Sequence, residues 1–195
     1  MGQRRIFLNG RVDDKSAHSL VGKMLFLDAV DPETPIVLYV NSGGGVVTSG
    51  LAIYDVMQHV RPPVYTVCIG HAESMAAVLL CAGEKGHRYV LPNARVMVHQ
   101  PHHVISGQTT DILIKATKAE HTRTTLRDII AKHSGRSAGE VIGVLERDTY
   151  MTAAEAVTFG LADEVITHIG ELGVPTKVPS GDGGGGGEKA SNGGE

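Results

Sequence analysis

Ser74 stands where two apolar segments of the sequence meet. Residues 64–69 lead into Gly70-His71-Ala72-Glu73-Ser74-Met75, and the apolar residues 76–81 follow. A strand, a tight turn and a helix in this order would lift the Ser74 hydroxyl beside the N–H of Met75, as at the nucleophile of other hydrolases, although their Gly-x-Ser-x-Gly motif is absent. A lone serine at a helix start is usually only a cap, so a nucleophilic Ser74 needs a base and an orienting acid.

His99 and Asp148 are the candidates for that base and that acid. His99 directly follows the apolar residues 96–98, and the end of a strand is a rigid place to hold an imidazole. Asp148 lies between two segments that carry helix-capping signals, and by position alone it is an ordinary loop acid. The order Ser, His, Asp is admissible because triads are defined by geometry. A metal cluster of His99, His102 and His103 is a weaker alternative, since the spacing matches no strong zinc signature.

A glycine turn, Asn41-Ser42-Gly43-Gly44-Gly45, follows another apolar segment and precedes a helical pattern. Backbone N–H groups at such a helix start can hold an anion. Phosphate binding is one use, but the Walker lysine and the spacing of the dinucleotide fingerprint are absent. An oxyanion hole is the other use.

The elements that would position these residues alternate between strands and helices. An apolar stripe at Ala17, Leu20, Val21, Met24 and Leu25 indicates a helix opened by Asp13 and Asp14. Ser137 with Glu140 and Thr152 with Glu155 fit the capping box and predict two more helix starts. The alternation predicts an α/β domain with a largely parallel sheet. Strands are predicted at residues 5–10, 36–40, 64–69, 89–91, 95–98 and 165–166, and the other helices at 46–60, from Ser74 to about 82, and at 109–133.

Composition bounds the class of protein. The chain has 195 residues, is 42% hydrophobic and 20% charged, and has a formal net charge of −3, with no basic run of the kind that binds nucleic acid. Two cysteines in apolar segments indicate buried thiols, and no segment approaches the ~20 apolar residues of a membrane span. We therefore expect a cytoplasmic protein with no nucleic-acid or membrane partner. Residues 1–172 are predicted to form one domain, and the glycine-rich residues 173–195 a disordered tail.

Several long motifs, in order, resemble the ClpP family of ring-forming serine peptidases. The likeness spans roughly residues 5 to 168, and the intervals from Ser74 to His99 and from His99 to Asp148 fit without a gap. The matching stretches are Ile6-Phe7-Leu8-Asn9-Gly10, Leu38-Tyr39-Val40-Asn41-Ser42-Gly43-Gly44-Gly45, Gly50-Leu51-Ala52-Ile53-Tyr54-Asp55, Gly70-His71-Ala72-Glu73-Ser74-Met75, Leu91-Pro92-Asn93-Ala94-Arg95-Val96-Met97-Val98-His99-Gln100-Pro101 and Glu146-Arg147-Asp148.

The resemblance implies an α/β fold of the ClpP/crotonase type, a spiral of strand–helix units with a protruding handle helix at residues 109–133. It implies that Ser74 is the nucleophile, His99 the general base and Asp148 the orienting acid of an acyl-enzyme mechanism. The oxyanion donors would be the N–H groups of Gly45 and Met75, and no metal or cofactor is required.

The resemblance also implies partners. The family forms two stacked heptameric rings and receives unfolded polypeptides from an AAA+ unfoldase ATPase of the ClpX, ClpA or ClpC type. An apolar docking pocket would include Tyr39 and Tyr89, with His59 where an aromatic residue is common. Glu146 and Arg147 stand where the family makes ion pairs between rings.

The sequence departs from the family in ways that keep other hypotheses open. The first strand is expected to start near residue 5, whereas the family usually carries a longer segment before it, and Ser42-Gly43-Gly44-Gly45 replaces Ser-Pro-Gly-Gly. His102-His103-Val104 replaces a Leu-Gly-Gly-like segment that pairs with substrate. These departures suggest, as an alternative, a weakly active or regulatory subunit of a mixed ring containing a second ClpP-like subunit. An acyl-CoA enzyme of the crotonase type is a further, weaker alternative, because it rests on fold likeness alone.

Overall fold

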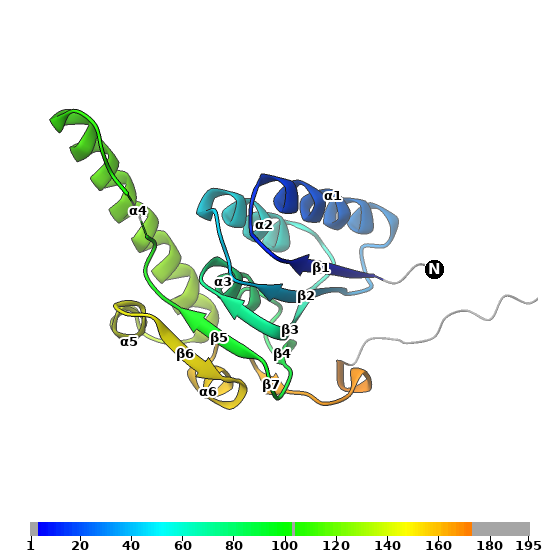
Figure 1. Ribbon diagram of the computed structural model, residues 1–195. Coiled ribbons are helices and arrows are strands. Elements are labelled where there is room, and N and C mark those ends of the chain that lie inside the picture. Colours follow the sequence, from blue (N-terminus) through cyan, green and yellow to red (C-terminus); the bar gives the residue numbers. More distant parts are fainter. Residues whose placement is uncertain (1–3, 103, 173–195) are drawn as a thin grey trace, which may run out of the picture.

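The computed structural model describes residues 4–102 and 104–172, so the tail predicted at residues 173–195 lies outside the described residues. Strands and helices alternate along the chain except at β4–β5 and α4–α5 (Figure 1). In chain order they are β1 (Arg5–Asn9), α1 (Asp14–Val30), β2 (Ile36–Ser42), α2 (Val47–His59), β3 (Val64–Glu73), α3 (Met75–Cys81), β4 (Arg88–Val90), β5 (Arg95–Val98), α4 (Thr109–Ser134), α5 (Ala138–Leu145), β6 (Thr149–Thr152), α6 (Ala153–Phe159), β7 (Glu164–Val165) and a 3-10 helix (Ile169–Leu172).

The sheet is largely parallel, which confirms the predicted α/β class. Its main path is β1-β2-β3-β4-β7, with parallel pairing throughout. β3 is longer than the predicted strand 64–69 because its last residues find a second partner. Residues 66–68 pair with β4, and residues 71–73 pair with β5. The segment Gly70-His71, which looks like a turn in the sequence, is held in the sheet by this pairing.

One strand was not predicted at all. β6 follows Asp148 and pairs antiparallel with β5. It has only four residues, and its last residue, Thr152, is also the N-cap of α6. So short a strand carries too little alternation to be recognised in sequence, and the capping signal hides its end.

The two faces of the sheet bury different residues, as the period-2 alternation of a strand requires. On β2, Ile36, Leu38 and Val40 belong to the main core under α1, α2 and α3. Val37 and Tyr39 face the opposite side, where a smaller cluster gathers. The cluster comprises Val37, Tyr65, Val67, Tyr89, Ile166 and Leu172.

The helix ends follow the capping chemistry expected from sequence. Ser137 and Thr152 each form a complete capping box, with Glu140 and Glu155 respectively, at the starts of α5 and α6. α1 begins after Asp13, which also caps it, and buries Ala17, Leu20 and Met24. The predicted stripe is wrong at Leu25, which is 44% exposed. α1 packs mainly on α2 and β1, so only a narrow stripe of it is covered.

α4 confirms the long helix predicted at residues 109–133. It projects away from the sheet in Figure 1, and only Leu126, Ile129 and Ile130 near its C-terminal end are buried. Ile112, Leu113 and Ile114 near its start are exposed. Among the described residues, the first half of this helix buries none of its side chains.

Candidate active site

Ser74 occupies the single residue between β3 and α3. Its φ is 54° and its ψ is −122°, and among the described residues it is the one non-glycine residue with a positive φ. Such a conformation typically costs about 1–3 kcal/mol and persists only where the surroundings enforce it. Ser74 N–H donates to the carbonyl of Met97 at 2.8 Å, which ties the turn to β5. The turn therefore places the Ser74 hydroxyl outside the regular backbone geometry of both β3 and α3.

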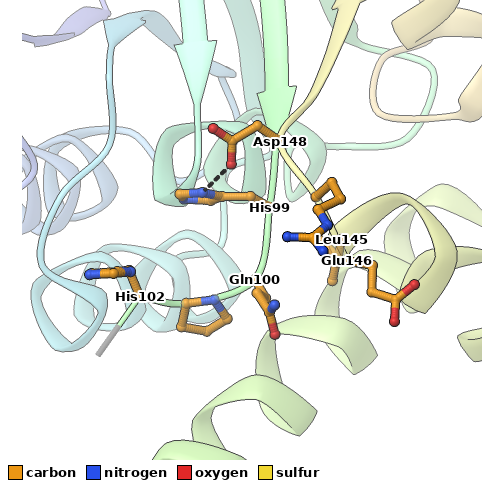
Figure 2. A pocket seen from close by; sticks show the side chains of 8 residues that line it. His99, Gln100, His102, Leu145, Glu146 and Asp148 are labelled. Carbon is orange, nitrogen blue, oxygen red and sulfur yellow. Dashed lines mark hydrogen bonds and ion pairs between the residues drawn. The ribbon is translucent and has the colours of Figure 1, made fainter. Parts of the chain in front are cut away.

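Ser74, His99 and Asp148 form one chain of hydrogen bonds. Ser74 Oγ lies 2.8 Å from His99 Nε2, and His99 Nδ1 lies 3.1 Å from Asp148 Oδ1, the contact dashed in Figure 2. With Nδ1–H donating to the carboxylate, Nε2 of a neutral ring is left to accept the Ser74 proton. This is the geometry that general-base activation of a hydroxyl requires.

β6 explains why Asp148 reaches His99. Val98 pairs with Thr149 in the antiparallel ladder, so the residues just beyond that pair, His99 and Asp148, stand opposite one another. Gln100 N–H donates to Leu145 O at 2.8 Å and fixes the chain on the other side of His99. Asp148 is 62% exposed, so its hydrogen bond to His99 alone would hold little. The backbone ladder, rather than this hydrogen bond, sets its position.

The backbone of the glycine turn packs directly against the backbone around Ser74. A Cβ on Gly44 would stand 2.9 Å from both Ser74 Cβ and Met75 N, so only glycine fits there. Val12 N–H donates to Gly44 O and Val46 N–H donates to Val12 O, both at 2.8 Å, which directs the N–H of Gly45 away from Val12. Met75 is the first residue of α3, and its N–H has no partner within the helix. The N–H of Met75 is therefore available as a donor beside Ser74, and the N–H of Gly45 belongs to the residue that follows Gly44 in the turn.

A cleft of about 940 Å³ runs past His99. Figure 2 shows His99 between Asp148 and the segment that carries Gln100 and His102, while the side chain of Glu146 points away from the imidazole. The cleft is lined by His99, Gln100, Pro101, His102, Leu145, Glu146, Arg147 and Asp148. The cleft therefore opens beside His99 and Asp148, and Ser74 is not among its lining residues.

The other predicted residues are distributed over the chain. Tyr39 and Tyr89 lie together on the sheet face opposite the helices, whereas His59 ends α2 on the helix-covered side. One chain therefore does not bring His59 to the two tyrosines. Glu146 and Arg147 are exposed at the end of α5.

Other candidate reactive groups are less suited to chemistry. Burial raises the pKa of the Cys68 and Cys81 thiols to about 12, so neither forms a thiolate readily. His102 is exposed, and His103 lies outside the described residues. Among the residues that the structure describes, no group of three or more His, Cys, Asp or Glu side chains could hold a metal ion.

Sequence reasoning missed the residues that anchor α3 from behind. Thr66, Arg88 and Gln58 each donate a side-chain hydrogen bond to the carbonyl end of this helix. Thr66 is a polar residue inside an apolar segment, and that signal could have marked it. Arg88 follows the polar residues 84–87 and carries no such signal.

Fold and site together define an α/β protein that holds a hydrogen-bonded Ser-His-Asp set at the end of a parallel sheet. The family model described as Clp protease matches residues 1–169. The chain therefore belongs to the Clp protease family, and this membership indicates a serine-type peptidase. No helix among the described residues combines the length and the apolar character that crossing a membrane requires.

Proposed function

We propose that this protein is a ring-forming serine endopeptidase that cleaves unfolded polypeptides through an acyl-enzyme on Ser74. The observation that carries the proposal is the 2.8 Å contact between Ser74 Oγ and His99 Nε2, continued from Nδ1 to Asp148. Ser74 acts as nucleophile, His99 as general base and Asp148 as the residue that orients the imidazole.

The reaction follows from the protonation states of these groups. His99 Nε2 takes the proton from Ser74 Oγ as the oxygen attacks the scissile carbonyl, and the ring gives that proton to the leaving amine. Water then attacks the acyl-enzyme with His99 again as base, which releases the acid product and restores Ser74. The N–H groups of Gly45 and Met75 stabilise the oxyanion in both steps, and losing one such donor typically costs about 2.7–4 kcal/mol of barrier.

Ser74→Ala tests the proposal. The purified assembly is incubated with a small fluorogenic peptide, and the rate is compared with that of Ser19→Ala, a change at an exposed serine on α1. We expect Ser74→Ala to lose nearly all turnover and all labelling by a fluorophosphonate, while Ser19→Ala keeps both. Equal turnover of the peptide in wild type and Ser74→Ala would contradict the proposal.

The partners belong to the same proposal. Clp proteases generally work with AAA+ ATPases in ring assemblies, and we propose two stacked heptameric rings fed by an unfoldase of the ClpX, ClpA or ClpC type. The exposed apolar start of α4 supports its use as the handle between rings. We propose that the exposed Glu146 and Arg147 make ion pairs between rings. Tyr39 and Tyr89 would form the docking pocket, completed by His59 from a neighbouring subunit.

A further inference from the structure

α3, the helix that begins beside Ser74, is fixed at its far end by side chains. It has only seven residues, all of them buried. The carbonyls at the end of a helix lack partners within it, and here three elements supply them. Thr66 Oγ1 on β3 donates to Leu80 O at 2.8 Å, Arg88 Nη1 on β4 to Cys81 O at 3.1 Å, and Gln58 Nε2 on α2 to Ala82 O at 3.1 Å.

Arg88 differs from the other two anchors because it joins three helices. Its side chain is only 3% exposed, and Nη1 also donates to His133 O at 2.9 Å and to Gly160 O at 3.0 Å. These carbonyls lie at the C-terminal ends of α4 and α6, so the negative dipole ends of α3, α4 and α6 converge on one guanidinium.

Asp163 holds the other edge of the guanidinium. Arg88 Nε donates to Asp163 Oδ2 at 2.8 Å, and Nη2 donates to Oδ1 at 2.6 Å. The same carboxylate accepts the backbone N–H groups of Arg88 and Gly86. This bidentate pair fixes the plane of the guanidinium and hence the direction in which Nη1 points.

The C-terminal end of α4 packs closely against its neighbours beside Arg88. His133 Nε2 lies 3.2 Å from the Tyr54 hydroxyl, and a Cβ on Gly160 would stand 2.5 Å from Ser134 O. The backbones of α4 and α6 therefore touch next to Arg88, and neither can shift without moving its hydrogen bonds.

We propose that Arg88 is a positioning residue for the reaction proposed at Ser74, on which this inference rests. By binding Cys81 O it sets the place of α3 along its axis, and α3 carries Ser74 at its opposite end. Arg88 also binds His133 O and Gly160 O. The position of α3 therefore depends on the positions of α4 and α6. A misplacement of about 1 Å at the reacting atom can cost on the order of a hundredfold in rate.

Three variants separate positioning from stability. Arg88→Met leaves Asp163 partly buried without its partner, which should destabilise the fold. The double variant Arg88→Met/Asp163→Leu removes both charges and should recover much of that stability, but it does not restore the bond to Cys81 O. Arg88→Lys keeps the charge but cannot reach Asp163 and all three carbonyls together.

The readouts are kcat and KM for a fluorogenic peptide and the rate of fluorophosphonate labelling of Ser74, on assemblies whose size is checked by sedimentation. We expect kcat and the labelling rate to fall on the order of tenfold to a hundredfold in the double variant, with KM unchanged, and to fall less in Arg88→Lys. A double variant or Arg88→Lys protein that folds and keeps wild-type kcat overturns the inference.

Controls distinguish this result from failure of the proposed function. Arg61→Met removes an exposed arginine that also pairs with a carboxylate, Asp28, and should leave kcat unchanged. If Ser74→Ala retains wild-type turnover, the proposed function fails. If Ser74→Ala is inactive while the double variant keeps full kcat, only the role of Arg88 fails.

Discussion

Each residue of the Ser-His-Asp set is held by a different kind of interaction. Ser74 is held by a strained backbone between β3 and α3, and His99 by the end of β5, which lies between β3 and β6. Asp148 is exposed and depends on the ladder between β5 and β6. The nucleophile is therefore the most constrained of the three, and the acid the least.

His133 should make folding stability depend on pH. Burial, together with the smaller effect of the charges of Lys132 and Arg88, lowers its pKa from 6.5 to about 4. Between these values the unfolded chain binds a proton that the folded chain does not, so stability is full above pH 6.5 and falls as the pH approaches 4. The loss attributable to His133 is about 2–3 kcal/mol.

His133→Gln tests this prediction, because the glutamine amide oxygen can still accept a hydrogen bond from the Tyr54 hydroxyl, whereas the amide group does not titrate. Urea unfolding at pH 7.5 and at pH 4.5 should show a smaller pH effect in His133→Gln than in wild type. His121→Gln, a change at an exposed histidine of the same helix, should keep the wild-type difference. An identical pH effect in wild type and His133→Gln would contradict the prediction.

At the scale of elements, the contact between the end of β2 and the start of α3 brings the proposed donors to Ser74. Gly44→Ala should break this contact. Its Cβ would stand 2.6 Å from Glu73 O and 2.9 Å from Met75 N, and φ is +79°. These are backbone atoms that cannot rotate away. We expect kcat/KM for a fluorogenic peptide to fall by about a hundredfold or more.

Gly43→Ala is the matched control. A Cβ there meets only the side chains of Glu73 and His71, at 3.7 and 4.0 Å, which is ordinary contact. Turnover should stay within a few-fold of wild type. Equal rates in the two alanine variants would show that close approach of the turn does not matter for catalysis.

The sequence predicts those elements whose signals are local. Ser137 and Thr152 mark the starts of α5 and α6, since a capping box needs only residues three apart. β6 and the end of β3 escape prediction because both are strands only through pairing with β5, a distant partner. For the same reason the sequence nominates Ser74, His99 and Asp148 but cannot show what brings Asp148 to His99.

At the scale of the whole molecule, the chain leaves an apolar segment at the tip of its projecting helix. Leu113 and Ile114 are 64% and 63% exposed, and Ile112 is 38% exposed. Contiguous apolar surface on a projecting element commonly marks a contact with another protein. The side chains that α4 adds to the main core of the described residues, Leu126, Ile129 and Ile130, lie toward its other end.

If α4 joins two rings, charges at this segment should separate them. We expect Leu113→Lys/Ile114→Lys to fold normally, because both side chains are already exposed, yet to sediment as a smaller species than wild type. His18→Lys/Ser19→Lys adds charge at exposed positions of α1 and should leave the sedimentation coefficient unchanged. Because the added lysines of two facing helices would repel one another across such a contact, raising the salt concentration should partly restore the larger species. A wild-type sedimentation coefficient in the α4 variant would place the contact between rings elsewhere on the molecule.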